Sequence, residues 1–186
     1  MVSAAGCKKS QQNANGPAMP QTTEAPAKSA DAAQESCRAF VQDFYDWYVK
    51  AESSPNNKIG SFSLAQARPH AISAGLQKLL DADYRASESD PDEIVGLDFD
   101  PFLNTQDPST KFTVQDATIK DGRCIAEVRG MQNGVPMESV NPELDQAAGT
   151  WEFINFHYPA AGPKESDHDL LSILRQLSAD RSKIHK

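Results

Sequence analysis

Residues 112–130, "FTVQDATIKDGRCIAEVRG", decide the fold class of this chain. On both sides of Asp121-Gly122, polar and apolar residues alternate with a period of two, which is typical of β-strands. The Asp-Gly pair favours the tight two-residue turn that joins antiparallel strands. Alternate residues from Cys124 to Val128 share one apolar face. The stretch therefore predicts an antiparallel hairpin with one buried side.

Two further strands are expected downstream of this hairpin. The first is "VPMESV", which follows a second turn signal at Asn133-Gly134. The second is "TWEFINFHY", which carries large apolar side chains on both faces and is therefore expected in the interior of a sheet. Strict alternation places Trp151, Phe153, Asn155 and His157 on one face of this strand and Glu152, Ile154, Phe156 and Tyr158 on the other.

Upstream of residue 111 the apolar period is helical. A first helix is predicted from an N-cap at Ser36, and a second begins near Ser73. A C-terminal helix is predicted in "DLLSILRQL", behind the acidic residues Asp167 and Asp169. The apolar stripe of the first helix comprises Cys37, Phe40, Val41, Phe44, Tyr45 and Tyr48, and that of the second Leu76, Leu79, Leu80 and Tyr84.

Helices followed by a run of hairpins predict an α+β fold. We expect N-terminal helices packed on a curved antiparallel sheet, with a helix at the C-terminus. The 186 residues would form one folded domain over residues 36–178. Residues 1–35 are expected to be a signal-peptide remnant followed by a disordered linker, because they are polar and lack core-forming residues. Residues 179–186 are expected to be a flexible tail.

The N-terminal "MVSAAGC" resembles the end of a bacterial lipoprotein signal peptide, with small residues directly before Cys7. A complete signal also needs a basic start and an apolar stretch of about 7 to 15 residues, and neither is present. Either the chain starts inside the signal or the match is chance. In the first case Cys7 would carry a lipid anchor, and Lys8 in place of aspartate would keep the protein at the outer membrane, facing the periplasm. Without lipidation the protein would be periplasmic or secreted.

Cys37 and Cys124 remain after Cys7 is assigned to lipidation. An oxidising periplasm would allow them to form a disulfide. Free cysteines are also common as small core residues, so the sequence leaves both states open.

The net charge of −8 argues against nucleic-acid binding, because an acidic domain repels phosphate backbones. No apolar run of 18 residues is present, so membrane contact is expected only through Cys7. The histidines His70, His157, His168 and His185 lack metal-ligand spacing, and neither a metal nor another cofactor is expected.

Four stretches of the chain, "VQDFYDWYVKA", "IVGLDFDPFLNTQDP", "WEFINFHYP" and "DLLSILRQL", together resemble an uncharacterised family of bacterial envelope proteins, many of them lipoproteins. The order of helices and hairpins resembles the nuclear-transport-factor-like, or cystatin-like, superfamily. The resemblance covers about residues 36–178. It implies a cone-shaped α+β fold and an envelope location, but it brings no established reaction.

The stretch "IVGLDFDPFLNTQDP" places Asp98 and Asp100 after an apolar run. A phosphatase of the haloacid-dehalogenase type would need a parallel sheet, which the downstream hairpins contradict. A calcium loop would need ligands where Phe102 and Leu103 stand. The favoured interpretation is that the two aspartates cap backbone amides or line the mouth of the cone.

A catalytic alternative uses a pocket within the cone. His157 beside Asp98 or Asp100 could perform acid/base chemistry there. The pocket residues would be Tyr45, Trp151, Asn155 and His157.

The favoured functional hypothesis is not an enzyme but a binding or accessory module tethered to the outer membrane. Its partner would be another envelope protein or a small apolar ligand held in the cone. Two alternatives stay open: the pocket enzyme, and an immunity protein whose acidic domain faces a basic secreted toxin.

Overall fold

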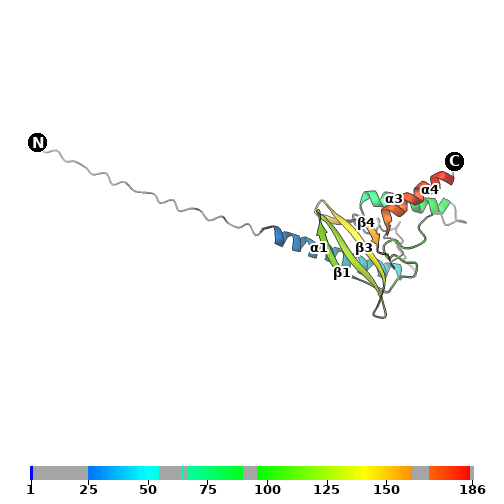
Figure 1. The fold of residues 1–186 in the computed structure, drawn as a ribbon, viewed down its shortest axis with the longest axis horizontal. Helices are drawn as coiled ribbons and strands as arrows, with labels where there is room; N and C mark the ends of the chain where they lie inside the picture. Colours follow the sequence, from blue (N-terminus) through cyan, green and yellow to red (C-terminus); the bar gives the residue numbers. More distant parts are fainter. Residues whose placement is uncertain (2–24, 55–63, 65–66, 90–95, 161–167, 185–186) are drawn as a thin grey trace.

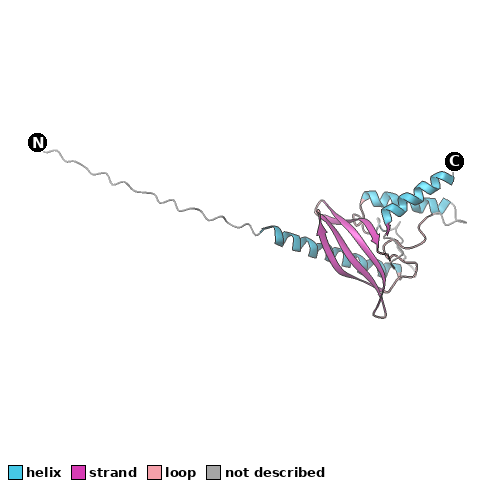
Figure 2. Cartoon of the chain, viewed as in Figure 1, coloured by secondary structure: helices cyan, strands magenta, loops and turns pink. Residues whose placement is uncertain are grey.

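The computed structural model describes Met1 and residues 25–54, 64, 67–89, 96–160 and 168–184. The described chain is an α+β fold in which a long N-terminal helix lies along one face of a curved antiparallel sheet (Figure 1). Two further helices gather at one end of the sheet (Figure 2). The fold class expected from the sequence is confirmed. None of the described helices is long and apolar enough to cross a membrane.

Helix α1 (Ala25–Glu52) buries the predicted apolar stripe, with Phe44, Tyr45 and Tyr48 at most 1% exposed. The prediction that this helix starts at Ser36 is wrong. It begins at Ala25, because the alanine-rich segment favours helix and Pro26, in the first turn, has no N–H to leave unpaired. Residues 25–35 therefore belong to the helix rather than to the linker.

Helix α3 (Ala74–Ser89) starts where the sequence placed it. The Ser73 hydroxyl accepts a hydrogen bond from the Leu76 amide at 3.3 Å, as an N-cap does. Leu80 is buried, but Tyr84 is 37% exposed and does not belong to the buried stripe. The buried residue on that part of the helix is Asp83, which the sequence did not single out.

The sheet is a simple meander in which each strand pairs antiparallel with the next along the chain. Both predicted turns, at Asp121-Gly122 and Asn133-Gly134, have the positive φ angles of a type I′ turn. A third turn of the same kind, at Ala148-Gly149, carries no comparable sequence signal. The strands are β1 (Lys111–Lys120), β2 (Arg123–Gln132), β3 (Val135–Ala147), β4 (Thr150–Tyr158) and β5 (His168–Asp169).

Strand β4 lies between β3 and β5, as expected for an interior strand, but its predicted faces are wrong. Its register with β3 shifts, because Leu144 pairs with Phe153 and the neighbouring Glu143 pairs with Asn155. Ile154 is the extra residue of a β-bulge, which reverses the faces of everything after it. The buried core residues of the strand are consequently Trp151, Phe153, Phe156 and Tyr158.

Helix α1 also closes the free edge of β1. Gln42 accepts a hydrogen bond from the Val114 amide at 2.9 Å and donates to the Phe112 carbonyl at 3.1 Å. Arg38 donates to the carbonyls of Val114 and Gln115. An edge with its amides and carbonyls occupied is protected against pairing with another chain.

Helix α4 (Leu170–Ile184) runs beyond the predicted end of the domain. The expectation of a flexible tail from residue 179 is wrong for residues 179–184, because Arg181 makes an ion pair with the buried Asp83 at 2.6 Å. The second carboxylate oxygen of Asp83 accepts a hydrogen bond from the Leu97 amide. This buried pair joins α3 to α4 and holds the segment that leads into β1.

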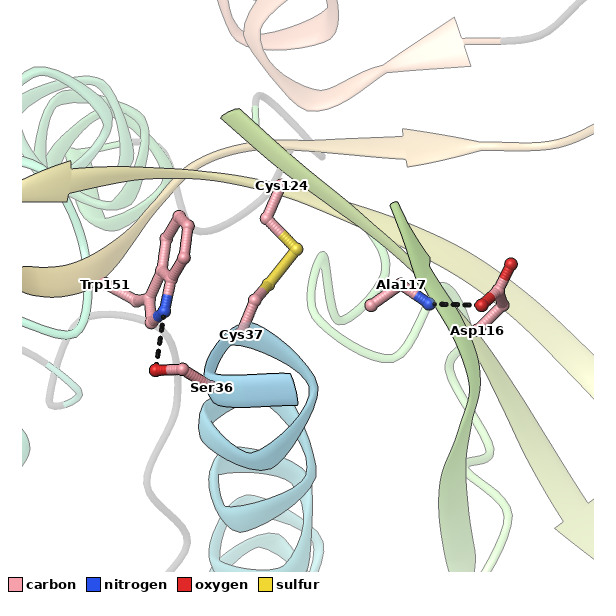
Figure 3. Close-up of a disulfide and its surroundings, with 6 residues drawn as sticks. All are labelled: Ser36, Cys37, Asp116, Ala117, Cys124 and Trp151. Carbon is pink, nitrogen blue, oxygen red and sulfur yellow. Dashed lines mark hydrogen bonds between the residues drawn. A yellow bond between two sulfur atoms is a disulfide. The ribbon is translucent and has the colours of Figure 1, made fainter. Parts of the chain in front are cut away.

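A disulfide joins Cys37 of α1 to Cys124 of β2, with 6.5 Å between their Cα atoms (Figure 3). Both sulfur-bearing residues are fully buried. Beside it, the Ser36 hydroxyl accepts a hydrogen bond from the Trp151 indole at 3.1 Å. The start of the buried stripe is thus fixed to β2 by a covalent bond and to β4 by a hydrogen bond.

We expect reduction of the disulfide to lower the free energy of unfolding substantially. The bond closes a loop of 87 residues, and loop-closure entropy predicts a loss of roughly 4–5 kcal/mol. Urea unfolding of the wild type, with and without reductant, measures the difference. The Cys37→Ala/Cys124→Ala variant is the control, because it should be insensitive to reductant. Equal stability of the oxidised and reduced wild type would contradict the prediction.

Candidate functional site

An acidic cavity lies where α1 ends and the segment before β1 passes. It has a volume of about 500 Å³. We call this cavity the mouth. Its lining residues are Glu52, Leu97, Asp98, Phe99, Asp100, Thr105, Gln106 and Pro108. Three of these eight carry carboxylates and none carries a positive charge.

Asp100 shapes the mouth by capping a turn. One carboxylate oxygen accepts hydrogen bonds from the amides of Phe102 at 2.8 Å and Leu103 at 3.1 Å. Its own amide donates to the carbonyl of Thr105 at 3.0 Å. These bonds close a tight turn over residues 100–105, so the aspartate acts as a local backbone cap.

Three tyrosine hydroxyls surround the same turn. Tyr48 donates to the second carboxylate oxygen of Asp100 at 2.8 Å. Tyr45 donates to the carbonyl of Phe102 and Tyr158 to that of Pro101, each at 2.9 Å. The turn is thereby attached to α1 and to β4 at once.

Burial controls the electrostatics of this cluster. Desolvation raises the pKa of Asp100 above its usual value, although the hydrogen bonds from Tyr48 and from the two amides oppose the shift. Burial, followed by the nearby charge of Asp100, raises the pKa of Tyr45 and of Tyr48 well above 10. Both tyrosines therefore stay neutral donors at physiological pH.

Asp98 differs from Asp100 in its exposure to solvent and in its hydrogen bonding. It is exposed, and no described residue forms a hydrogen bond or ion pair with it. Glu52, in the last turn of α1, lies in the same lining. A carboxylate at a helix C-terminus is disfavoured by the helix dipole, and this was the sequence signal that could have identified Glu52.

Aromatic rings fill the core between α1 and the sheet. Phe44 packs against Phe153 at 4.7 Å, Tyr48 at 5.4 Å and Phe102 at 6.0 Å between ring centroids. These rings occupy the space between α1 and the sheet, where the sequence placed a small apolar ligand. The mouth lies outside this ring cluster, at the C-terminal end of α1.

The predicted pocket residues are separated by β4. Tyr45 lies beside Asp100 at the mouth. His157 lies on the other side of the sheet, where Nε2 is 3.0 Å from Glu143, which also accepts a hydrogen bond from Arg123. Among the described residues, no hydrogen bond or ion pair joins His157 to either aspartate of the mouth.

Asn155 and Trp151 have structural contacts. The Asn155 amide donates to Asp169 at 3.0 Å, and its carbonyl oxygen accepts from the amide of Leu171, which fixes the start of α4. Trp151 is buried against Ser36 near the disulfide. Cys7 lies outside the described residues.

The described part of the chain contains no group of three or more histidine, cysteine, aspartate or glutamate side chains placed to hold a metal ion. The carboxylates of the mouth do not form such a group.

No protein-family model matches the chain, and no curated protein matches it. Among solved structures, a chain of the type VI effector-immunity complex Tae3-Tai3 from Ralstonia pickettii is similar in two crystal structures, at 19% and 21% identity, each with a TM-score of 0.49. The alignments cover 68% and 69% of this chain and 99% of the other.

A protein of unknown function from Bacteroides thetaiotaomicron is similar at 16% identity and a TM-score of 0.47. That alignment covers 73% of this chain and 98% of the other. Likenesses of this extent say nothing about an activity or a partner of this chain.

The raised pKa of Asp100 predicts a specific pH dependence of stability. The folded state holds this proton more tightly than the unfolded chain, where the pKa is near 3.8. The stabilising contribution is therefore full below pH 3.8 and is lost as the pH rises through the folded pKa. We therefore compare the free energy of unfolding of the wild type with that of Asp100→Asn. The difference should fall as the pH rises from 3.8 through the folded pKa of Asp100, and it should be constant at higher pH.

Urea titrations at a series of pH values from about 3 to 8 test this expectation. The Tyr48→Phe variant should extend the window to higher pH, because it removes a hydrogen bond that lowers the pKa of Asp100. Parallel stability curves for the wild type and Asp100→Asn would show that Asp100 keeps its ordinary pKa.

Proposed function

We propose that this protein is a binding module of the bacterial envelope whose mouth receives a basic side chain of a partner protein. The observation that carries the proposal is the lining of the mouth, with three carboxylates and no lysine, arginine or histidine. Asp100 is committed to the turn by its hydrogen bonds. Asp98 is exposed and has no described partner, so it is the carboxylate most available to a ligand.

The surroundings of Asp98 favour a specific contact over a loose surface pair. Ion pairs between fully exposed groups contribute little, because water screens them. Here the half-buried Leu97 and Phe99 line the same cavity and would exclude water from a bound arginine or lysine. The chain's net charge of −8 would also speed the approach of a basic partner.

The location of the module is part of the proposal. Small residues before Cys7, and the polar stretch after it, support lipidation at Cys7 and a tether to the outer membrane. The succession of N-terminal helices and a curved antiparallel sheet supports membership of the nuclear-transport-factor-like superfamily.

A narrower candidate is an immunity protein that binds a basic secreted effector. The acidic mouth in an acidic chain favours it, because complementary charge gives both fast association and selectivity. A resident envelope partner and a secreted effector would use the same cavity. The identity of the bound protein separates the two.

We expect the Asp98→Asn variant to weaken binding of the partner by several-fold to about tenfold, because it removes a charge-assisted contact. The partner is first purified with the wild-type protein from envelopes of the native host, and its dissociation constant is then measured by calorimetry. Asp121→Asn is the matched control. It also removes one negative charge, and Asn-Gly keeps the β1–β2 turn.

Equal affinities of the two variants would contradict a role for the mouth. Urea unfolding of each variant confirms that any loss of affinity is not a loss of folding. A partner identified as a secreted effector would favour the immunity protein, and a resident envelope protein would favour the accessory module.

The Cys7→Ser variant is expected to move from the membrane fraction to the soluble fraction. Loss of the thiol removes the only attachment point proposed for lipid. Fractionation of cells and incorporation of labelled palmitate measure the change. Cys37→Ala/Cys124→Ala removes the two disulfide-bonded cysteines and should leave membrane association unchanged. Membrane association of Cys7→Ser would contradict the proposed anchor.

A further inference from the structure

A second cavity, of about 490 Å³, lies along the β2–β3 hairpin and reaches its turn at Asn133-Gly134. This hairpin projects beyond the other strands (Figure 1). We call the cavity the hairpin groove. Residues that line it include Thr110 and Lys111 from the start of β1, Arg129 and Met131 from β2, and Pro136 from β3.

The hairpin groove carries charge opposite to that of the mouth. Lys111 is exposed, and no described residue pairs with it. Arg129 donates to Glu127 through Nε at 3.0 Å and Nη2 at 2.7 Å, which leaves Nη1 for another acceptor. Two cations therefore line a hollow in a chain that is otherwise strongly acidic.

Apolar side chains lie beside these cations, because Met131 and Pro136 line the same groove. Val135 and Met137, 56% and 57% exposed, belong to the same hairpin but do not line the groove. Exposed apolar side chains next to a charged hollow are typical of surfaces that bind proteins, where the apolar contact supplies energy and the charges supply register.

The hairpin groove and the mouth share one segment of the chain. Pro108 lines the mouth and Thr110 lines the groove, so their Cα atoms are at most about 7.6 Å apart. Ser109 between them is 2% exposed, and both its amide and its hydroxyl donate to the carboxylate of Glu138 on β3. The segment is thus fixed to the sheet.

Gly130 makes this attachment possible. A Cβ atom at that position would overlap the carboxylate of Glu138 and press on the Phe112 ring. A second bond, from the Asn104 amide to the Ser139 carbonyl at 3.0 Å, holds the other side of the turn to β3. The two cavities therefore keep a constant separation.

We propose that the partner protein bound at the mouth also places a carboxylate in the hairpin groove, between Lys111 and Arg129, with an apolar side chain against Met131. This inference rests on the proposed function and adds the second half of the partner's contact surface. An ordinary interface covers about 800 Å² on each partner, which is enough to span two cavities this close. The occupant is a protein that presents a basic and an acidic side chain on either side of the Pro108–Thr110 segment.

The dipolar arrangement gives selectivity that neither cavity has alone. A partner with only basic groups is attracted to the mouth and repelled by Lys111. A partner with only acidic groups is attracted to the hairpin groove and repelled by the carboxylates of the mouth. A protein that presents its basic group to the mouth and its acidic group to the hairpin groove gains from both contacts. Once the first contact has formed, the second forms within the complex and needs no further association step.

Peptide binding followed by two-dimensional amide NMR tests the inference on the folded protein. The probes are capped alanine-serine peptides that carry one arginine, one glutamate, or both separated by spacers of about 3 to 6 residues, a length that spans the two cavities. The peptide with both charges should shift the amides of Asp98 and Gln106 together with those of Lys111 and Thr113. Its affinity should exceed that of either single-charge peptide by about tenfold or more.

The Lys111→Glu variant should bind the peptide with both charges no more tightly than the arginine peptide, and it should still bind the arginine peptide. Lys120→Glu is the matched control, because Lys120 is exposed at the opposite end of β1 and lies outside the groove. It should keep the full gain.

The outcomes distinguish this inference from the proposed function. If the arginine peptide binds at the mouth but the second charge adds nothing, or if Lys111→Glu and Lys120→Glu behave alike, the inference is wrong and the proposed function stands. If the arginine peptide does not shift the mouth, the proposed function is wrong and the two-cavity inference falls with it.

Discussion

The contact between α1 and the sheet is the interaction on which the rest of the structure depends. One face of this helix supplies rings to the core, and Phe44 alone touches rings from α1, β4 and the segment before β1. Its flank supplies Arg38 and Gln42, which occupy the free edge of β1. Its last turn supplies Glu52 to the mouth. A meander sheet has no crossover helices to cover it, so α1 provides many of the core rings, the edge protection and part of the mouth, while α3 and α4 add Leu76, Leu80, Leu170 and Leu174 to the core.

The position of α1 is fixed at two points along its length by different chemistry. Near the start of its buried stripe, the disulfide from Cys37 and the Trp151–Ser36 hydrogen bond hold it to the sheet. Toward its C-terminal end, Tyr45 and Tyr48 hydrogen-bond to the turn at Asp100. The mouth is therefore assembled by the same tyrosines that complete the core, which makes its geometry a consequence of folding rather than of a mobile loop.

Local signals predicted the parts of the fold that local physics controls. The Asp-Gly and Asn-Gly turns, the cap at Ser73 and the strand "TWEFINFHY" all depend on neighbouring residues, and the structure contains each of them. The bulge at Ile154 depends on how β3 pairs with β4, so alternation alone could not reveal it. That single register shift moved His157 away from the mouth. The end of α4 was missed for a similar reason, because Arg181 is held by Asp83, a partner 98 residues away.

The two aspartates that the sequence singled out have different contacts, and under the proposed function this difference would let the mouth bind a cation without losing its shape. Asp100 accepts hydrogen bonds from one tyrosine and two amides, so a ligand that competed for its carboxylate would have to break the turn. Asp98 has no such bonds and can meet a cation at no cost to the fold. The sequence placed both residues at the mouth because they follow an apolar run. The hydrogen bond from Tyr48 and the two from the amides of Phe102 and Leu103 identify Asp100 as the structural carboxylate.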